Sequence, residues 1–186
     1  CCRVESNWEV DKTIGNRRVI AVVPAYNERD NIVSTIEDLR SNAPGVDYVI
    51  VNDGSKDDTL SICREHGYNV IDLPVNLGLA GAFQTGMRYA YKHGYDYAIQ
   101  FDADGQHSAA YIYEMIRVAE TQDANIVIGS RFATQKKPLS ARMAGSVLIS
   151  AMILLTTRQR IQDPTSGMRL FDRKMIPLFA NEMDFG

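Results

Sequence analysis

Short runs of β-branched and aliphatic residues alternate with amphipathic stretches along this chain, and the alternation constrains its fold more than any other feature. Residues 18–24 form a continuous apolar run closed by proline, which is typical of a strand buried on both faces. The next stretch, residues 27–40, places its apolar residues on one stripe of a helix. Further strands are predicted at residues 47–52, 68–73, 95–101 and 125–128, and further helices at residues 57–66, 78–93 and 109–121.

This order of elements predicts an α/β fold. A βαβ rhythm with short connections gives a mostly parallel central sheet with helices on both faces, a Rossmann-like three-layer α/β/α arrangement. From about residue 138 onward the alternation fades into a longer helix and then a loop at residues 162–169. We expect residues 1–17 to form a polar N-terminal arm and residues 18–186 to form one domain.

Composition excludes several classes of function. The net charge is −3 and there is no basic tract, so a nucleic-acid partner is not expected. Three cysteines, Cys1, Cys2 and Cys63, show no metal-ligand spacing, which favours a reducing, cytoplasmic setting. The longest apolar stretch, residues 144–155, is shorter than the ~20 residues that cross a bilayer. It is interpreted as a core or interfacial helix.

An acidic motif at residues 101–107 carries the strongest chemical signal. If the chain is extended there, Asp102, Asp104 and Gln106 face one side, because alternate residues of a strand point the same way. Two carboxylates and an amide oxygen are hard ligands suited to Mg²⁺ or Mn²⁺. The alternative interpretation of the same residues is a turn capped by aspartate and glycine.

Other motifs follow the remaining strands, at the sheet edge where ligands of α/β proteins gather. They are P-A-Y-N-E at residues 24–28, N-D-G-S-K-D at 52–57 and G-S-R at 129–131. Together with D-A-D-G-Q-H, these motifs in this order resemble the family 2 glycosyltransferases of the GT-A fold. The segment D-P-T-S-G-M-R at residues 163–169 resembles the polyprenyl-phosphate sugar transferases, the group that includes dolichyl-phosphate mannose synthase.

The resemblance implies contacts for the nucleoside of a nucleotide-sugar. It gives Pro24, Tyr26 and Glu28 base and ribose contacts, and it makes Asp53 the carboxylate that accepts from a base N–H. Two of these residues keep a structural alternative. Glu28 is also suited to the positive end of a helix, and Asp53 to an Asx turn before Gly54.

The resemblance also implies a catalytic and metal-binding set. Asp102 matches a ribose- or metal-facing carboxylate, Asp104 and Gln106 match metal ligands, and Arg131 matches an arginine that meets phosphate. Asp102, Asp104 and Arg131 are therefore the expected catalytic residues.

Four further residues are expected to bind substrate. They are Gly78 in a glycine-rich helix start, Arg142, and Asp163 and Ser166 of the loop at residues 162–169. Tight helix packing is the alternative for Gly78, and a solvated surface position is the alternative for Arg142.

The function implied is metal-dependent inverting transfer of a sugar from UDP- or GDP-sugar. The acceptor would be a polyprenyl phosphate or a growing cell-surface glycan, reached by peripheral contact with the cytoplasmic face of a membrane. Family members usually continue with acceptor-binding segments, so we expect the domain to be truncated at its C-terminal end.

Three other functions are compatible with an α/β sheet of this kind. A pyrophosphorylase requires G-x-G-T-R after the first strand and an oxidoreductase requires G-x-G-x-x-G, and neither motif is present. A non-catalytic nucleotide-sugar-binding domain or fragment stays open as the alternative.

Overall fold

The core of the computed structural model is a six-stranded sheet in the order β3-β2-β1-β4-β6-β5, and the structure describes residues 15–105, 108–129 and 168–182. The strands are β1 (Val19–Ala25), β2 (Asp47–Asn52), β3 (Val70–Asp72), β4 (Tyr97–Phe101), β5 (Ile126–Ile128) and β6 (Met168–Asp172). The helices are α1 (Ile32–Asn42), α2 (Thr59–Glu65), α3 (Gly78–Lys92), α4 (Ile112–Thr121) and α6 (Met175–Pro177), with short helical turns η1 (Ala109–Tyr111) and η2 (Leu178–Glu182).

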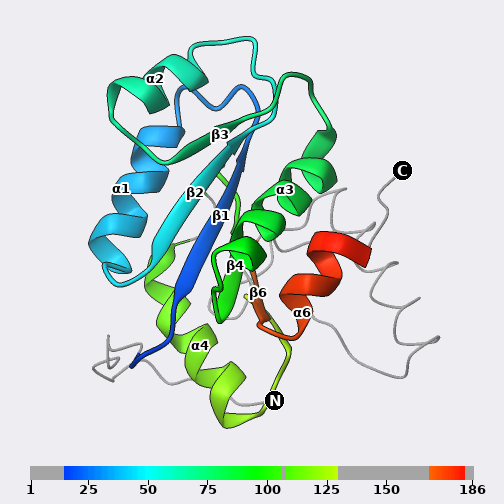
Figure 1. The fold of residues 1–186 in the computed structure, drawn as a ribbon. Helices are drawn as coiled ribbons and strands as arrows, with labels where there is room; N and C mark the ends of the chain where they lie inside the picture. The colour runs from blue at the N-terminus through cyan, green and yellow to red at the C-terminus, as the bar shows by residue number, and fades with distance from the viewer. Residues whose placement is uncertain (1–14, 106–107, 130–167, 183–186) are drawn as a thin grey trace, which may run out of the picture.

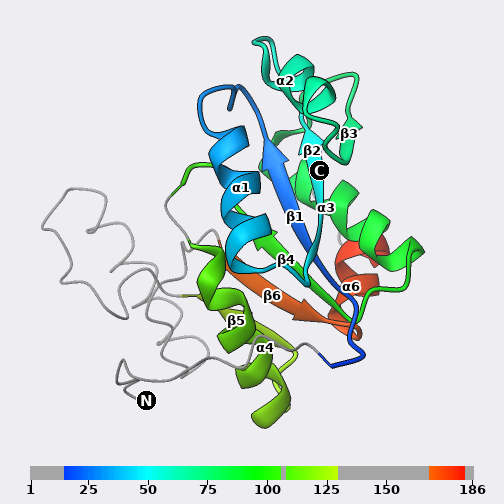
Figure 2. The same cartoon turned by 90° about the vertical axis from the view of Figure 1, so that its left-hand side faces the viewer.

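Helices cover both faces of the sheet (Figures 1 and 2). In β1 the buried residues alternate between two hydrophobic clusters, with Val19, Ala21 and Val23 on one face and Ile20 and Val22 on the other. The first face packs against α1, α2 and α4, and the second packs against α3 and α6. This two-sided burial explains the continuous apolar run of the first strand and confirms the predicted three-layer α/β/α fold.

The pairing of the strands brings their carboxyl ends together. β1 pairs in parallel with β2 and β4, and β2 pairs in parallel with β3. β6 runs antiparallel to both β4 and β5, and Met168 at its start lies opposite Phe101 at the end of β4. The carboxyl ends of β1, β2 and β4 and the beginning of β6 therefore share one edge, which we call the carboxyl edge.

Helix α3 approaches the sheet unusually closely. A Cβ atom placed on Gly86 would lie 2.1 Å from Cγ1 of Val22, which is fully buried in the central strand β1. Glycine thus lets α3 sit against β1, and this contact sets the position of the helix start at the carboxyl edge.

Two predictions about elements were wrong. The loop predicted at residues 162–169 does not extend through Met168 and Arg169, because these residues begin strand β6 and pair with β4 and β5. The first helix begins at Ile32 and not at Asn27, because Asn27 adopts a left-handed backbone conformation with φ of 57°. Most of the predicted arm at residues 1–17 and the helix predicted after residue 138 lie outside the described residues.

Within the described ranges, no helix is both long enough and apolar enough to span a membrane. The apolar stretch at residues 144–155 lies outside the described ranges.

Candidate functional site

A cavity of about 500 Å³ opens at the carboxyl edge of the sheet. Its lining comes from the ends of β1, β2 and β4 and from the start of α3. The residues that line it are Pro24, Ala25, Tyr26, Glu28, Asp53, Asn76, Gly78, Leu79, Ala82, Asp102, Ala103 and Asp104. Three separate sequence motifs and the predicted Gly78 therefore meet in one place, as the rule for ligand sites in parallel sheets predicts.

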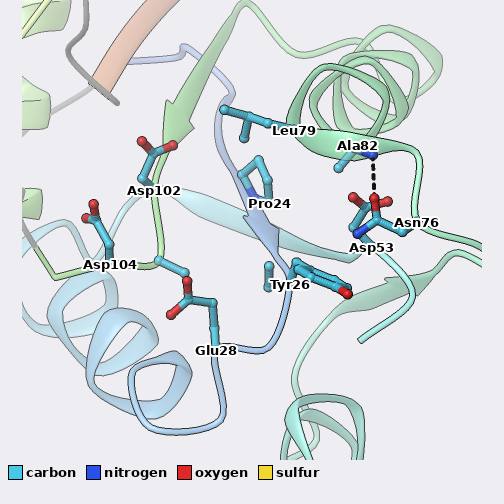
Figure 3. Close-up of a pocket in the computed structure, with 12 residues that line it drawn as sticks. Pro24, Tyr26, Glu28, Asp53, Asn76, Leu79, Ala82, Asp102 and Asp104 are labelled. Atoms are coloured by element: carbon cyan, nitrogen blue, oxygen red, sulfur yellow. Dashed lines mark hydrogen bonds between the residues drawn. The ribbon is translucent and has the colours of Figure 1, made fainter. Parts of the chain in front are cut away.

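Four of the lining side chains are carboxylates, and the described residues that line the cavity include no lysine or arginine. In Figure 3, Asp102 and Asp104 lie on one side of the cavity, Asp53 lies on the other near Asn76, and Pro24 and Tyr26 lie between them. Such a concentration of negative charge disfavours an anion unless a cation accompanies it.

The acidic motif forms a turn and not an extended strand. Ala103 and Asp104 lie in a turn after β4, and Gly105 has a positive φ of 69°. The extended geometry expected for this motif is therefore wrong, because the chain bends as soon as β4 ends. Asp102 and Asp104 nevertheless both line the cavity, the first half-buried and the second exposed, while Ala103 between them is buried.

Two side chains of helix α1 form hydrogen bonds to the backbone of this turn and of the residues that follow it. The hydroxyl of Thr35, a residue that is 4% exposed, shares its proton between the carbonyl oxygen of Asn31 at 2.9 Å and that of Ala103 at 3.2 Å. The carboxylate of Asp38 accepts from the backbone N–H of Ala109 at 2.7 Å, just after the acidic motif. Helix α1 thus contacts the backbone of the acidic motif at Ala103 and the backbone just after the motif at Ala109.

Gln100 is a site residue that the sequence analysis missed. Its side-chain amide is 5% exposed and donates to Oδ1 of Asp102 at 3.1 Å, which orients that carboxylate. A glutamine within an otherwise apolar strand was the available signal, because buried polar side chains need partners.

The carboxylate oxygens in the cavity are suitable ligands for a hard divalent cation. Asp102 and Asp104 present carboxylate oxygens to the same space, and Asp102 has an orienting hydrogen bond. Among the described residues, no cluster of three histidine, cysteine or acidic side chains is arranged to hold a metal. The third predicted ligand, Gln106, lies outside them.

Asp53 joins two loops of the cavity. It is 3% exposed, and its Oδ1 accepts from the backbone N–H of Leu77 at 2.7 Å. Gly54 next to it has φ of 64°, and a Cβ there would lie 2.9 Å from the nitrogen of Asn76. The Asp53 carboxylate therefore bonds the loop between β3 and α3. A local Asx turn, the predicted alternative for Asp53, does not include this bond.

The loop after β1 supplies Tyr26 and Glu28. The Tyr26 side chain is 41% exposed, so one face of the ring is available at the cavity mouth. Glu28 is half-buried, and its Oε2 accepts from the side-chain amide of Asn31 at 2.9 Å. Glu28 also accepts through its backbone carbonyl from the N–H groups of Asn31 and Ile32, so it begins the turn that leads into α1.

The remaining predicted site residues, Arg131, Arg142, Asp163 and Ser166, lie outside the described residues, and their contacts stay predictions. Cys63 belongs to the core. Burial raises the pKa of its thiol to about 11, which suits a packing residue and not a nucleophile.

Comparison with known proteins identifies the family. The model of the family described as glycosyl transferase family 2 matches residues 20–178, most of the chain. The chain belongs to this family. The resemblance seen in its motifs is therefore confirmed, and the cavity at the carboxyl edge is the place where those motifs meet.

Two relatives carry names that specify a lipid phosphate. The UDP-N-acetylglucosamine–dolichyl-phosphate N-acetylglucosaminyltransferase of Methanococcus voltae is 28% identical over 191 aligned residues, covering 91% of this chain and 75% of that protein. The undecaprenyl-phosphate mannosyltransferase of Micrococcus luteus is 31% identical over 166 residues, covering 83% of this chain and 66% of that protein.

A solved structure gives the same fold. The glucosyl-3-phosphoglycerate synthase of Mycobacterium tuberculosis, in complex with Mn²⁺, UDP and glucosyl-3-phosphoglycerate, superposes with a TM-score of 0.69 at 18% identity. The match covers 86% of this chain and 58% of that chain. The chain thus spans between somewhat over half and three quarters of the length of these proteins.

Proposed function

We propose that this chain binds a nucleotide-sugar together with a divalent metal ion and transfers the sugar, with inversion, to a polyprenyl phosphate. The observation that carries the proposal is the cavity with four carboxylates and no lysine or arginine among its described lining residues. A nucleoside diphosphate is itself anionic, so its binding in this cavity requires a cation between the two sets of charges.

Asp102 and Asp104 are the residues that would hold the metal, with Gln106 as the predicted third ligand. Bound there, Mg²⁺ or Mn²⁺ would supply positive charge to the diphosphate as it leaves. Gln100 keeps the Asp102 carboxylate oriented through its hydrogen bond, and Thr35 holds the backbone between the two aspartates.

The opposite side of the cavity suits the nucleoside. Asp53 is almost fully buried, so a base N–H that reaches it would form a hydrogen bond shielded from water. Tyr26 offers an exposed aromatic face, and Glu28 offers an acceptor for ribose hydroxyls. UDP and GDP both meet these requirements.

A polyprenyl phosphate acceptor is supported by the names of the relatives and by the chemistry available in the cavity. The oxygen of a phosphate is already anionic, so it can displace the nucleoside diphosphate at the anomeric carbon without a strong general base. Arg131 and Arg142 are the predicted contacts for phosphate, because the guanidinium group pairs well with phosphate oxygens. The reaction would take place at the cytoplasmic face of a membrane.

Calorimetric titration with UDP and GDP, each with and without Mn²⁺, tests the proposal. We expect binding to depend on Mn²⁺, and we expect Asp104→Asn to remove the part of the affinity that Mn²⁺ confers. Asp123→Asn is the matched control, because Asp123 is an exposed carboxylate with a positive φ that asparagine tolerates. Equal Mn²⁺-dependent binding by the Asp104 variant would contradict the metal assignment, and binding without transfer to polyprenyl phosphate would favour a non-catalytic domain.

A further inference from the structure

We propose that Asp57 and Thr59 fix the position of the nucleoside-binding loop and thereby control nucleoside affinity without touching the ligand. The nucleoside-binding loop is defined as residues 26–31. The Asp57–Thr59 latch is defined as the side chains of Asp57 and Thr59, which lie just before and at the start of α2. The inference rests on the proposed function, since it concerns how the same cavity is kept in shape. Neither latch residue lines the cavity, whereas Tyr26 and Glu28 do.

Thr59 is the centre of the latch. Its hydroxyl accepts from the backbone N–H of Glu28 at 2.9 Å and donates to Oδ1 of Asp57. Thr59 is fully buried, so water cannot replace either partner if the other is removed. The backbone at Glu28 is therefore held by a side chain that lies 31 residues further along the chain.

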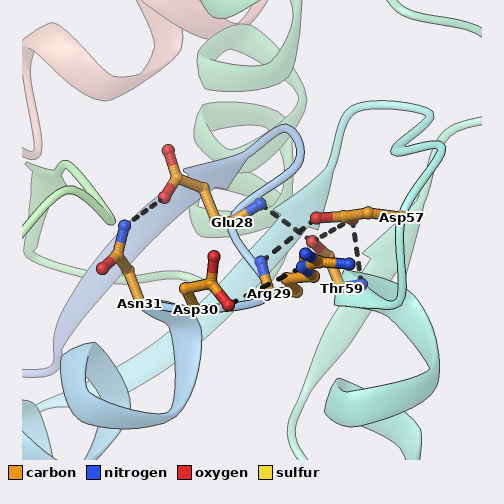
Figure 4. Close-up of polar contacts among 6 residues, drawn as sticks. All are labelled: Glu28, Arg29, Asp30, Asn31, Asp57 and Thr59. Atoms are coloured by element: carbon orange, nitrogen blue, oxygen red, sulfur yellow. Dashed lines mark hydrogen bonds and ion pairs between the residues drawn. The ribbon is translucent and has the colours of Figure 1, made fainter.

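Asp57 completes the connection. Its Oδ1 also accepts from the backbone N–H of Thr59 at 3.0 Å, and its Oδ2 accepts from the backbone N–H of Arg29 at 3.3 Å (Figure 4). Partial burial alone would raise the pKa of this carboxyl, but the hydrogen bonds from Thr59 and Arg29 lower it overall. Asp57 is consequently ionised at neutral pH, and its hydrogen bonds are charge-assisted.

A second connection holds the other side of the loop. The N–H of Asn27 donates to the hydroxyl of Ser55 at 3.0 Å, and Oδ1 of Asn27 accepts from the N–H of Lys56 at 2.8 Å. Asn27 has φ of 57°, a left-handed conformation that a side chain with local hydrogen bonds tolerates best. Consecutive residues 27–29 are thus each bound to the segment 55–59, which comprises the loop after β2 and the first residue of α2.

The arrangement amounts to preorganisation of a binding loop. Tyr26 and Glu28 flank the left-handed residue, so a loop released from the latch would have to be reordered when the ligand binds. The diphosphate end of the cavity is held without the latch residues, because Gln100 bonds the Asp102 carboxylate and Thr35 of α1 contacts the carbonyl oxygen of Ala103. Loss of the latch should therefore weaken contacts to the nucleoside and spare those to the diphosphate.

The test compares two ligands, both with saturating Mn²⁺: the preferred nucleoside diphosphate, UDP or GDP, and inorganic diphosphate. We expect Asp57→Asn and Thr59→Val to bind the nucleoside diphosphate roughly five- to tenfold more weakly, the loss expected for one or two newly mobile side chains. Inorganic diphosphate should bind with unchanged affinity. Thr59→Ser retains the hydroxyl and should restore nucleoside diphosphate binding.

Asp58→Asn is the matched control for charge, because Asp58 is an exposed carboxylate between the two latch residues whose side chain forms no capping hydrogen bond and does not line the cavity. It should bind both ligands like the unaltered chain. A double-mutant cycle adds a second criterion: Asp57→Asn should cost less nucleoside affinity in a Glu28→Ala background, since the latch acts through Glu28.

Two results would overturn the inference while leaving the proposed function intact. One is unchanged nucleoside diphosphate affinity in Asp57→Asn, and the other is an equal loss for both ligands in both latch variants. If the unaltered chain binds neither UDP nor GDP with Mn²⁺, the proposed function and the inference that rests on it both fall.

Discussion

Replacing Gly86 with alanine tests how closely α3 packs against the sheet. A Cβ at this position would lie 2.1 Å from Cγ1, 3.0 Å from Cγ2 and 3.1 Å from Cβ of Val22. Rotation of the valine about χ1 cannot relieve the whole contact, because the Cβ of Val22 does not move in such a rotation and lies only 3.1 Å away. The helix must therefore move away from β1, or the strand must deform.

Two opposing effects set the magnitude. Alanine is a better helix former than glycine and should stabilise the middle of α3 by ~0.5–1 kcal/mol. Overpacking a well-filled core costs ~1–3 kcal/mol, and Val22 is fully buried in the central strand. We expect a net loss of about 1–2 kcal/mol, which corresponds to a fall in Tm of ~2–8 °C for a domain of this size.

Urea denaturation followed by circular dichroism measures the change, and the Val22→Ala background supplies the control. With the valine methyl groups removed, Gly86→Ala should become neutral or stabilising by up to ~1 kcal/mol. An equal cost of Gly86→Ala in both backgrounds would refute the contact. A Gly86→Ala variant that is more stable than its parent when Val22 is present would also refute the contact. Because Gly78, Leu79 and Ala82 of α3 line the cavity, nucleotide affinity should fall along with stability in the Val22 background only.

The other predictions concern Asp53 and Tyr95. Asp53→Asn should weaken binding of the preferred nucleotide by about 1–3 kcal/mol if a buried hydrogen bond to the base is lost, as calorimetry will measure. Asp53→Ala should in addition lower the free energy of unfolding, because only alanine loses the bond to the Leu77 N–H. Equal nucleotide affinity in the wild type and in Asp53→Asn would show that Asp53 is a purely structural residue. For Tyr95, burial first, and then its hydrogen bond to Asp47, raise the pKa to about 12. The folded state therefore holds the Tyr95 proton more tightly than the unfolded chain, and its contribution to stability is complete below pH 10 and is lost as pH rises through 12. Difference absorbance titration of wild type against Tyr95→Phe should assign one tyrosinate to this high range, and ionisation of that tyrosine near pH 10 would contradict it.

Much of the fold was predictable because its strands are buried on both faces. The continuous apolar run of β1 and the apolar stripe of α1 are both strong signals, and the structure buries both, although α1 begins five residues later than predicted. Strand β6 was missed for a physical reason: it is short, it contains Arg169, and its antiparallel pairing with β4 and β5 depends on residues distant in sequence. Local patterns carry little information about such pairing.

The site was predictable at the level of motifs, since topology alone sends the ends of β1, β2 and β4 to one edge. The interactions that hold each motif were not predictable in the same way. Thr35 and Asp38 lie on α1 and look like ordinary helix residues, yet they bind the backbone around the acidic turn. Likewise Asp57 stands at the start of the helix predicted at residues 57–66, where an acidic residue is ordinary, and its bond to the backbone of Arg29 appears only once the two loops are side by side.

The antiparallel strand also bears on the predicted phosphate contacts. β5 runs parallel to β4, because both are antiparallel to β6, so Gly129 at its end lies at the carboxyl edge. There the N–H of Gly129 donates to the carbonyl oxygen of Met168 at 2.9 Å, and Met168 lies opposite Phe101, which precedes Asp102. Gly129 and Met168, the described residues on either side of the segment 130–167, therefore lie together at one point beside the start of the acidic motif. A parallel β6 would have started at the opposite edge of the sheet, so its reversed direction is what brings Met168 and Arg169, the last two residues of the motif at residues 163–169, to the carboxyl edge.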